Sequence, residues 1–276
     1  MVEQLIRNEQ VVGSNPTVGS SVHRARRGRG WELLVAHRIF NLYEVADYLH
    51  LSRGDIERLV RRNEIPFERK GEKLVFNRND IDGWATKRII GSGKGSEQLA
   101  EFHKKTSTAK NHNLAKEHAI IPDLLKGTFV EPALKSKTKA SVISDMVALA
   151  DKTDLLLQKA DLLKSLKERE QMCSTALAGG IALLHPRNHQ PYMFEDSFIV
   201  LGRTVQPIPF SSPDGMTTDL FFLVCCQDDR THLHVLARLC VLCYQTTMLL
   251  DLREAETAED MYQVLINAEQ EVIKDL

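Results

Sequence analysis

The sequence predicts an α/β fold in which helices cover a sheet, preceded by a smaller domain of helices and one β-hairpin. Three short apolar runs lie at residues 180–184, 198–202 and 220–226, and helical patterns flank them. Strand-length apolar runs that alternate with helices are typical of a layered α/β domain. A second pattern, before residue 90, has two short helices, a hairpin and a third helix. A length of 276 residues fits two domains.

Changes in composition divide the chain into four parts. They are an N-terminal extension over 1–34, a small domain over 35–90, a linker over 91–119 and a larger domain over 120–276. The extension has no helical or strand period and contains a basic, Gly-rich run over 24–30. Three interpretations stay open: a disordered arm that adds positive charge on nucleic acid, a tail without a role, or residues upstream of the true start. We favour the last two. The linker is rich in Gly and Ser and then in Lys, which is typical of a flexible connection.

Charge is distributed unevenly along the chain. Residues 35–90 carry 11 Lys and Arg against 9 Asp and Glu, whereas residues 120–276 carry 15 against 22. A mildly basic front and an acidic back indicate two different partners. No apolar run has the roughly 18 to 20 residues that span a bilayer, so we expect no membrane insertion.

The five cysteines are Cys173, Cys225, Cys226, Cys240 and Cys243. Their number is odd and no secretory signal is visible, so we expect a reduced cytoplasmic location. Cys240 and Cys243 have the spacing of metal ligands but lie in an apolar helical pattern without a second pair. Buried thiols are therefore favoured over a zinc or redox site, and we expect neither a metal nor a cofactor.

The small domain follows a winged helix-turn-helix plan. Leu42, Val45, Ala46 and Leu49 share one helical face, and Ser52 is a good N-cap for a second helix. Two short strands then surround a turn at Gly71. A third helix, capped at 77–80, contains Ile81 and Trp84. The second helix has the right size for a DNA major groove, and the basic hairpin can lie along phosphates.

These residues resemble the excisionase/MerR-like DNA-binding family. The matching blocks are Leu42-x2-Val45-Ala46-x2-Leu49-x-Leu51-Ser52, Leu59-Val60-Arg61-Arg62-x-Glu64-Ile65-Pro66 and Phe76-Asn77-Arg78-x-Asp80-Ile81-x2-Trp84. The resemblance implies DNA as a partner, with contacts from the second helix (Arg53, Arg58, Arg61 and Arg62) and from the wing (Arg69, Lys70 and Lys73). The carboxylates of Asp55 and Glu57 on the second helix weaken the non-specific attraction to DNA. The resemblance therefore implies that DNA binding needs two copies of the protein or a partner. The alternative is a helix-turn-helix kept only as a protein-interaction module.

In the larger domain, Ser141 is expected to cap a helix, and a helical pattern covers 155–170. The three apolar runs follow as buried strands, and further helices are expected near 231–249 and 258–276. A histidine, His185, stands where the first of these strands ends.

The larger domain resembles the enzyme IIA domain of the phosphotransferase sugar-uptake system, in its mannitol/fructose/nitrogen-regulatory class. The matching blocks are Arg169-Glu170-x3-Ser174-Thr175, Gly180-Ile181-Ala182-x2-His185, Ile199-x-Leu201-Gly202-Arg203, Pro207-Ile208-x-Phe210-x2-Pro213-Asp214-Gly215, Asp219-Leu220-x-Phe222-Leu223 and His232-Leu233-x2-Leu236-Ala237-x-Leu239. The resemblance implies an α/β (α+β) sandwich of the enzyme IIA type, with a mixed sheet covered by helices and a small winged helix-turn-helix domain before it.

The resemblance also implies site residues. His185 would accept a phosphoryl group from a histidine-containing phosphocarrier protein, and Arg169 and His232 would hold that group. Ser174 and Thr175 would add hydroxyl or backbone donors. An imidazole suits this chemistry because it is partly neutral near pH 7 and nucleophilic at one nitrogen. The family usually has proline directly before the histidine, whereas Leu184 stands here and Pro186 follows. Competence for phosphorylation and a silent site therefore both stay open.

The sequence thus predicts a cytoplasmic bacterial DNA-binding regulator tuned through His185, or through docking of the phosphocarrier; homodimerisation stays open. One alternative is a phosphoryl carrier or transferase, with a phosphohistidine intermediate, whose front domain only docks proteins. The other is a regulator that binds an effector and is not phosphorylated.

Overall fold

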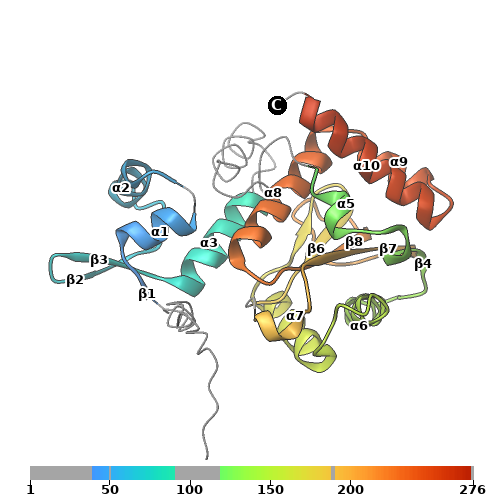
Figure 1. Cartoon of the computed structure of the whole chain (residues 1–276), viewed down its shortest axis with the longest axis horizontal. Coiled ribbons are helices and arrows are strands. Elements are labelled where there is room, and N and C mark those ends of the chain that lie inside the picture. Colours follow the sequence, from blue (N-terminus) through green and yellow to red (C-terminus); the bar gives the residue numbers. More distant parts are fainter. Residues whose placement is uncertain (1–38, 50, 91–118, 188–189, 275–276) are drawn as a thin grey trace, which may run out of the picture. The chain divides into compact units, whose positions relative to one another are not determined.

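The structure is a computed structural model that describes residues 39–49, 51–90, 119–187 and 190–274 (Figure 1). The expectations for residues 1–34, and for all of the linker except Ala119, lie outside the described residues. The small domain and the larger domain are described separately below.

The small domain contains the predicted helices and hairpin, with one additional strand. Its elements are β1 (Ile39–Phe40), α1 (Leu42–Tyr48), α2 (Arg53–Arg61), β2 (Glu68–Lys70), β3 (Lys73–Asn77) and α3 (Arg78–Ile90). The three strands form an antiparallel sheet in the order β1-β3-β2. Strand β1 was not predicted, because two residues are too short to leave a periodic pattern.

Local signals in the sequence explain where these elements begin and turn. The Ser52 side chain accepts a hydrogen bond from the backbone N–H of Asp55, and the Asp55 carboxylate accepts one from the N–H of Ser52. This capping box confirms the predicted start of α2. Gly71 has a φ of +63° between β2 and β3, a conformation that glycine adopts without strain. The core of the domain contains Val45, Leu49, Ile56, Phe76 and Ile81.

The larger domain is a five-stranded sheet with helices around it. Its elements are α5 (Ile121–Leu124), η2 (Gly127–Phe129), β4 (Val130–Leu134), α6 (Lys139–Asp151), α7 (Lys159–Met172), β5 (Ala176–Leu177), β6 (Ile181–Leu184), η3 (Pro191–Met193), β7 (Phe198–Ile208), β8 (Thr218–Cys225), α8 (Asp229–Gln245), α9 (Met248–Glu254) and α10 (Ala258–Lys274). The strand order is β4-β7-β8-β6-β5.

The sheet is mixed, as predicted. Strand β8 runs antiparallel to β7 and parallel to β6, and the outer pairs are parallel for β4 with β7 and antiparallel for β5 with β6. Helices α6 and α7 lie on one side of the sheet in Figure 1, and α10 lies on the other. Gly202 on β7 permits this packing, since a Cβ there would approach Leu134 to 2.3 Å and Met146 to 2.7 Å. The central strands are buried on both faces, which explains their continuous apolar sequence.

Three predicted helix boundaries were wrong. Helix α6 is capped by Thr138, and Ser141 is the third helical residue of that capping box. Helix α7 begins at Lys159 rather than near residue 155, because Leu156 pairs as a β-bridge with Phe194. The helix expected over 231–249 is two helices, α8 and α9, separated at 246–247. Apolar periodicity does not distinguish a bent pair from one helix, so only the structure gives this break.

In the described part of the chain, no single helix has the length and hydropathy of a membrane span; α8 and α9 pass that test only as a pair bent by 82°. Cys240 and Cys243 are buried in α8, which agrees with their interpretation as packed thiols. Burial raises the pKa of the Cys240 thiol to about 12, so this thiol stays protonated at neutral pH.

Candidate functional site

The site in the larger domain is built around His185, directly after strand β6. The imidazole is only 2% exposed, and its Nδ1 lies 2.8 Å from the carbonyl oxygen of Leu183. Because a carbonyl can only accept a hydrogen bond, we assign the ring proton to Nδ1. The lone pair of the neutral ring is then on Nε2. This tautomer has its nucleophilic nitrogen on the side away from Leu183.

Arg169 lies on the Nε2 side of this ring. It occupies the last turn of α7 and is 7% exposed, and its Nε donates to His185 Nε2 over 3.0 Å. Its Nη1 donates to the carbonyl oxygen of Cys173 over 3.0 Å and contacts the Cys173 Sγ at 3.3 Å. The guanidinium is therefore held beside Nε2, close to where a group bonded to that nitrogen would carry its charge.

A second histidine completes the group. His232 lies in the first turns of α8, is fully buried, and has its ring centroid 4.9 Å from that of His185. The structure thus brings together Arg169, His185 and His232, which are spread over 64 positions of sequence and come from α7, the end of β6 and α8.

The two hydroxyl residues predicted for this site have other partners. Ser174 Oγ donates to the carbonyl oxygen of Phe210 over 2.6 Å. Thr175 Oγ1 donates to the Glu170 carboxylate over 2.7 Å. Both hydroxyls are thus engaged away from His185, and their direct contact with a phosphoryl group stays a prediction.

The segment on either side of His185 fits the fold. Leu184 is buried in β6, where it pairs with Leu223 of β8, so the apolar side chain that replaces the family's usual proline belongs to the core. Pro186 is also buried, and the N–H of Arg187 donates to Ser165 Oγ over 2.9 Å. The loop after the histidine is thereby attached to α7.

Sequence reasoning missed a buried network beside the site. The Glu170 carboxylate is paired with Lys139 Nζ at 2.7 Å and accepts hydrogen bonds from both the N–H and the hydroxyl of Thr175. The sequence does show an acidic residue, Glu170, next to Arg169 at the end of a predicted helix, and this was the one signal of such a network. A distant partner such as Lys139, however, cannot be identified from sequence spacing.

In the small domain, the predicted cationic residues are on the surface. The side chains of Arg58, Arg61 and Arg62 on and after α2 are exposed, as are those of the hairpin residues Arg69, Lys70 and Lys73. Arg58 forms a salt bridge with Asp55, and the Arg53 guanidinium lies 4.2 Å from the ring centroid of Tyr43 on α1. The second helix and the wing therefore both present positive side chains to solvent.

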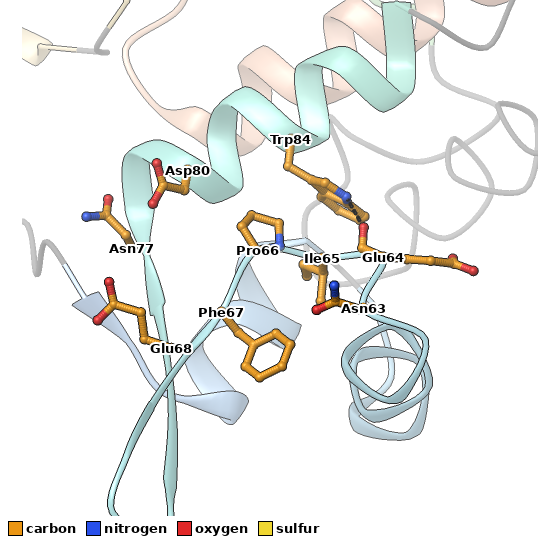
Figure 2. Close-up of a pocket in the computed structure, with 9 residues that line it drawn as sticks. All are labelled: Asn63, Glu64, Ile65, Pro66, Phe67, Glu68, Asn77, Asp80 and Trp84. Atoms are coloured by element: carbon orange, nitrogen blue, oxygen red, sulfur yellow. Dashed lines mark hydrogen bonds between the residues drawn. The ribbon is translucent and has the colours of Figure 1, made fainter.

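A hollow of about 480 Å³ lies between the hairpin, α3 and the loop after α2 (Figure 2). Its lining includes the acidic residues Glu64, Glu68 and Asp80, of which Glu64 directs its carboxylate away from the other two in Figure 2, and Trp84 Nε1 donates to the carbonyl oxygen of Glu64. Like charges repel, so a hollow lined by the carboxylates of Glu68 and Asp80 does not suit a phosphate group. In the described part of the chain, no group of three or more His, Cys, Asp or Glu could hold a metal ion.

Comparison with known proteins identifies both domains. Residues 123–268, more than half of the chain, match the family model "Phosphoenolpyruvate-dependent sugar phosphotransferase system, EIIA 2". The chain belongs to this family. Residues 40–89 match the model of a helix-turn-helix domain.

Relatives align with the larger domain. The nitrogen regulatory protein of Bradyrhizobium diazoefficiens is 30% identical over 147 residues, which are 52% of this chain and 94% of that protein. The nitrogen regulatory protein of Escherichia coli (strain K12) is 31% identical over 141 residues, 49% of this chain and 81% of that protein. The fructose-specific EIIABC component of Bacillus subtilis (strain 168) is 27% identical over 147 residues, and only 23% of its length is covered.

Among solved structures, the nitrogen regulatory protein IIA-Ntr from Neisseria meningitidis aligns with 53% of this chain and 99% of its own. Its sequence identity is 24% and its TM-score is 0.48. IIA mannitol from Escherichia coli aligns with 51% of this chain and 98% of its own, at 15% identity and a TM-score of 0.46.

Proposed function

We propose that this chain is a bacterial DNA-binding regulator whose enzyme IIA-type domain accepts a phosphoryl group on His185 from a histidine-containing phosphocarrier protein, or docks that protein. The observation that carries the proposal is the hydrogen bonding of His185: Nδ1 donates to Leu183, and Nε2 faces Arg169. A nucleophilic nitrogen and a cation for the incoming charge are thereby next to each other.

The chemistry follows from this arrangement. Nε2 attacks the phosphorus of the phosphocarrier's phosphohistidine, the new N–P bond forms as the old one breaks, and the carrier's imidazole leaves with the electron pair. The proton on Nδ1 stays in place, held by the Leu183 carbonyl. The Arg169 guanidinium must leave Nε2 and donate to the phosphoryl oxygens instead. A phosphoryl group carries about −1.5 to −2 charges at neutral pH, so the positive guanidinium offsets part of that negative charge.

His232 has a supporting part in the proposal. Its ring lies beside that of His185 within a fully buried part of α8. A phosphoryl group on Nε2 would bring about two negative charges next to this ring, and a protonated imidazole would offset them. We therefore propose that His232, together with Arg169, stabilises the phosphorylated form.

The phosphorylation half is tested by incubating the full chain with phosphoenolpyruvate and the bacterial phosphocarrier system. The expected result is one acid-labile, alkali-stable phosphate per chain, absent from His185→Ala. His232→Ala should still be phosphorylated but lose the phosphate faster. If the phosphocarrier is labelled but the wild-type chain takes up no phosphate, phosphorylation of His185 is rejected. Docking would then be measured by titrating the chain with the phosphocarrier.

DNA binding is supported by the helix-turn-helix match and by the exposed cations of α2 and the hairpin. A helix such as α2 fits a major groove, and Arg69, Lys70 and Lys73 can lie along the phosphate backbone. Asp55 and Glu57 on α2 reduce non-specific attraction, so we propose that a stable complex needs two copies of the chain. Phosphorylation of His185 would change the charge of the other domain and thereby bias assembly or DNA binding.

The proposed DNA binding is tested with genomic fragments of the host in a gel-shift experiment. Salt-sensitive, sequence-specific binding that falls in Arg58→Ala supports the regulator. The main alternative is a phosphoryl carrier whose front domain only docks proteins. It predicts phosphate on His185 with no specific DNA complex at any salt concentration. If the chain neither takes up phosphate nor docks the carrier but still binds specific DNA, the result instead favours a regulator that responds to an effector.

A further inference from the structure

The buried carboxylate of Glu170 has no part in the phosphoryl chemistry, yet it contacts the segments that hold both Arg169 and His185. It is 7% exposed, and three donors surround it: Lys139 Nζ at 2.7 Å, the Thr175 N–H at 3.1 Å and the Thr175 hydroxyl at 2.7 Å. A carboxylate in such a place needs paired charge and hydrogen bonds, because leaving water is costly. This network satisfies both needs.

On one side, Glu170 determines where Arg169 lies. The two residues are consecutive in the last turn of α7, so their side chains leave the helix about 100° apart. Arg169 is directed at His185 Nε2, while Glu170 is directed at Thr175 and Lys139. Fixing the Glu170 carboxylate therefore fixes the end of the helix from which the guanidinium extends.

On the other side, Glu170 acts through Thr175 on His185. The carbonyl oxygen of Thr175 accepts a hydrogen bond from the N–H of Leu183 over 3.0 Å, and the carbonyl oxygen of Leu183 accepts the Nδ1 proton of His185. The N–H of the same residue, Thr175, donates to the Glu170 carboxylate. Three hydrogen bonds, joined through the backbone of Thr175 and of Leu183, thus lead from the carboxylate to the nitrogen that defines the histidine tautomer.

Lys139 provides the opposite charge from a third element. It is the first residue of α6, its ammonium pairs with Glu170, and it lies 4.6 Å from the ring centroid of Phe210. Phe210 in turn accepts the Ser174 hydroxyl through its carbonyl oxygen. The ammonium therefore connects the start of α6 with the loop that precedes β5.

We propose that Glu170, together with Lys139 and Thr175, is a positioning network that keeps the Arg169 guanidinium beside His185, within reach of a group bonded to Nε2, and keeps the ring proton of His185 on Nδ1. This inference rests on the proposed phosphorylation of His185. It gives Thr175 a different role from direct contact with a phosphoryl group. A positioning group of this kind changes reactivity by misplacing the reacting atoms, and shifts near 1 Å cost about 100-fold in rate.

The test combines two measurements on the full chain. In ¹⁵N-labelled protein, the imidazole signals report which ring nitrogen of His185 carries the proton, without any phosphocarrier. The initial rate of phosphate incorporation from the phosphocarrier reports reactivity. Glu170→Gln and Lys139→Met should each give a mixture of tautomers and a rate lower by about 10- to 100-fold. Lys139→Arg keeps the positive charge and should therefore keep the wild-type tautomer and most of the wild-type rate.

Two further variants keep the test decisive if Lys139→Met folds poorly. Thr175→Val removes the hydroxyl but keeps the shape, and Thr175→Ser keeps the hydroxyl. The network predicts mixed tautomers for the first and the wild-type tautomer for the second. The control is Lys137→Met, since this exposed lysine lies two residues from Lys139 and should change neither measurement.

Wild-type tautomer and wild-type rate in Glu170→Gln would overturn the positioning role. If Thr175→Val lowers the rate of phosphate incorporation but leaves the His185 tautomer unchanged, the network is rejected. That result would instead support direct contact of Thr175 with the phosphoryl group. If the wild-type protein takes no phosphate, the proposed phosphorylation fails by itself, whereas the tautomer measurement still decides whether Glu170 positions His185.

Discussion

The enzyme IIA-type domain buries Arg169 and His185, whereas the helix-turn-helix domain leaves Arg58 and Arg61 exposed to solvent. Inside a protein, hydrogen bonds and charge pairs are stronger, and an unpaired group is expensive. At the surface, water and salt screen the same groups, and most single pairs contribute little. A change in the first domain should therefore have a large, local effect. Changes in the second should be small and dependent on salt.

The largest effect on stability is expected from Arg238→Met. Arg238 of α8 pairs with Glu269 of α10 at 3.0 Å, and the same carboxylate accepts the N–H groups of Ile120 and Ile121. Removing one partner of a buried pair costs about 3–5 kcal/mol. Urea unfolding followed by circular dichroism would measure this cost. Lys159→Met breaks the exposed pair with Asp151 and should cost less than about 1 kcal/mol; equal costs would contradict the contrast between buried and exposed charge.

The next effect concerns Arg169 and depends on phosphorylation of His185. Arg169→Met removes the donor that faces Nε2, and loss of such a preorganised donor lowers rates by about 10²- to 10³-fold. Arg169→Lys keeps the charge but not the planar geometry, so it should recover only part of the rate. The initial rate of phosphate transfer measures both variants. Lys164→Met, on the exposed face of the same helix, is the matched control; a similar loss there would mean that α7 is merely disturbed.

A smaller effect is expected when one exposed cation of α2 is removed. Arg61→Ala should weaken DNA binding at low salt and reduce the slope of log affinity against log salt by about one, as expected for one lost phosphate contact. Fluorescence anisotropy over a range of salt concentrations measures this slope. Lys135→Ala in the other domain has the same change of charge and should leave the slope unchanged.

The smallest effect is expected at Tyr43. Its ring is 62% exposed and lies beneath the Arg53 guanidinium, a contact that is worth about 0.5–1 kcal/mol at an exposed site. Tyr43→Leu should therefore lower specific DNA affinity only about two- to fivefold, by freeing Arg53. Tyr43→Phe keeps the ring and should bind like the wild type. If both variants lose affinity equally, the phenol hydroxyl rather than the stack is what matters.

Local sequence signals predicted most elements of the small domain because each has a nearby cause. Ser52 caps α2 through Asp55 three residues later, and Gly71 turns the hairpin with a positive φ. The apolar runs that became β6, β7 and β8 were equally clear, since buried strands have continuous apolar sequence. The cap of α6 was harder: Thr138 and Ser141 are both good caps, and the sequence alone does not choose between them.

The candidate site was predictable only in part. Arg169, His185 and His232 were named through a family resemblance, not through spacing, because residues so far apart have no local pattern. Glu170 stood in the same matching block, but its pairing with Lys139 required the approach of α6 to the end of α7. Thr175 was predicted as a donor at the site, whereas its hydroxyl is engaged by Glu170.

By itself, the sequence determined that a helix-turn-helix plan precedes a mixed α/β domain and that a histidine follows the strand Ile181–Leu184. Helical and strand periods, caps and turns act over a few residues, so they can be read along the chain. Only the tertiary structure decided which nitrogen of His185 is protonated and which side chains surround it. These depend on Leu183, Thr175 and Arg169, whose contacts form only when α6, α7 and β6 pack together.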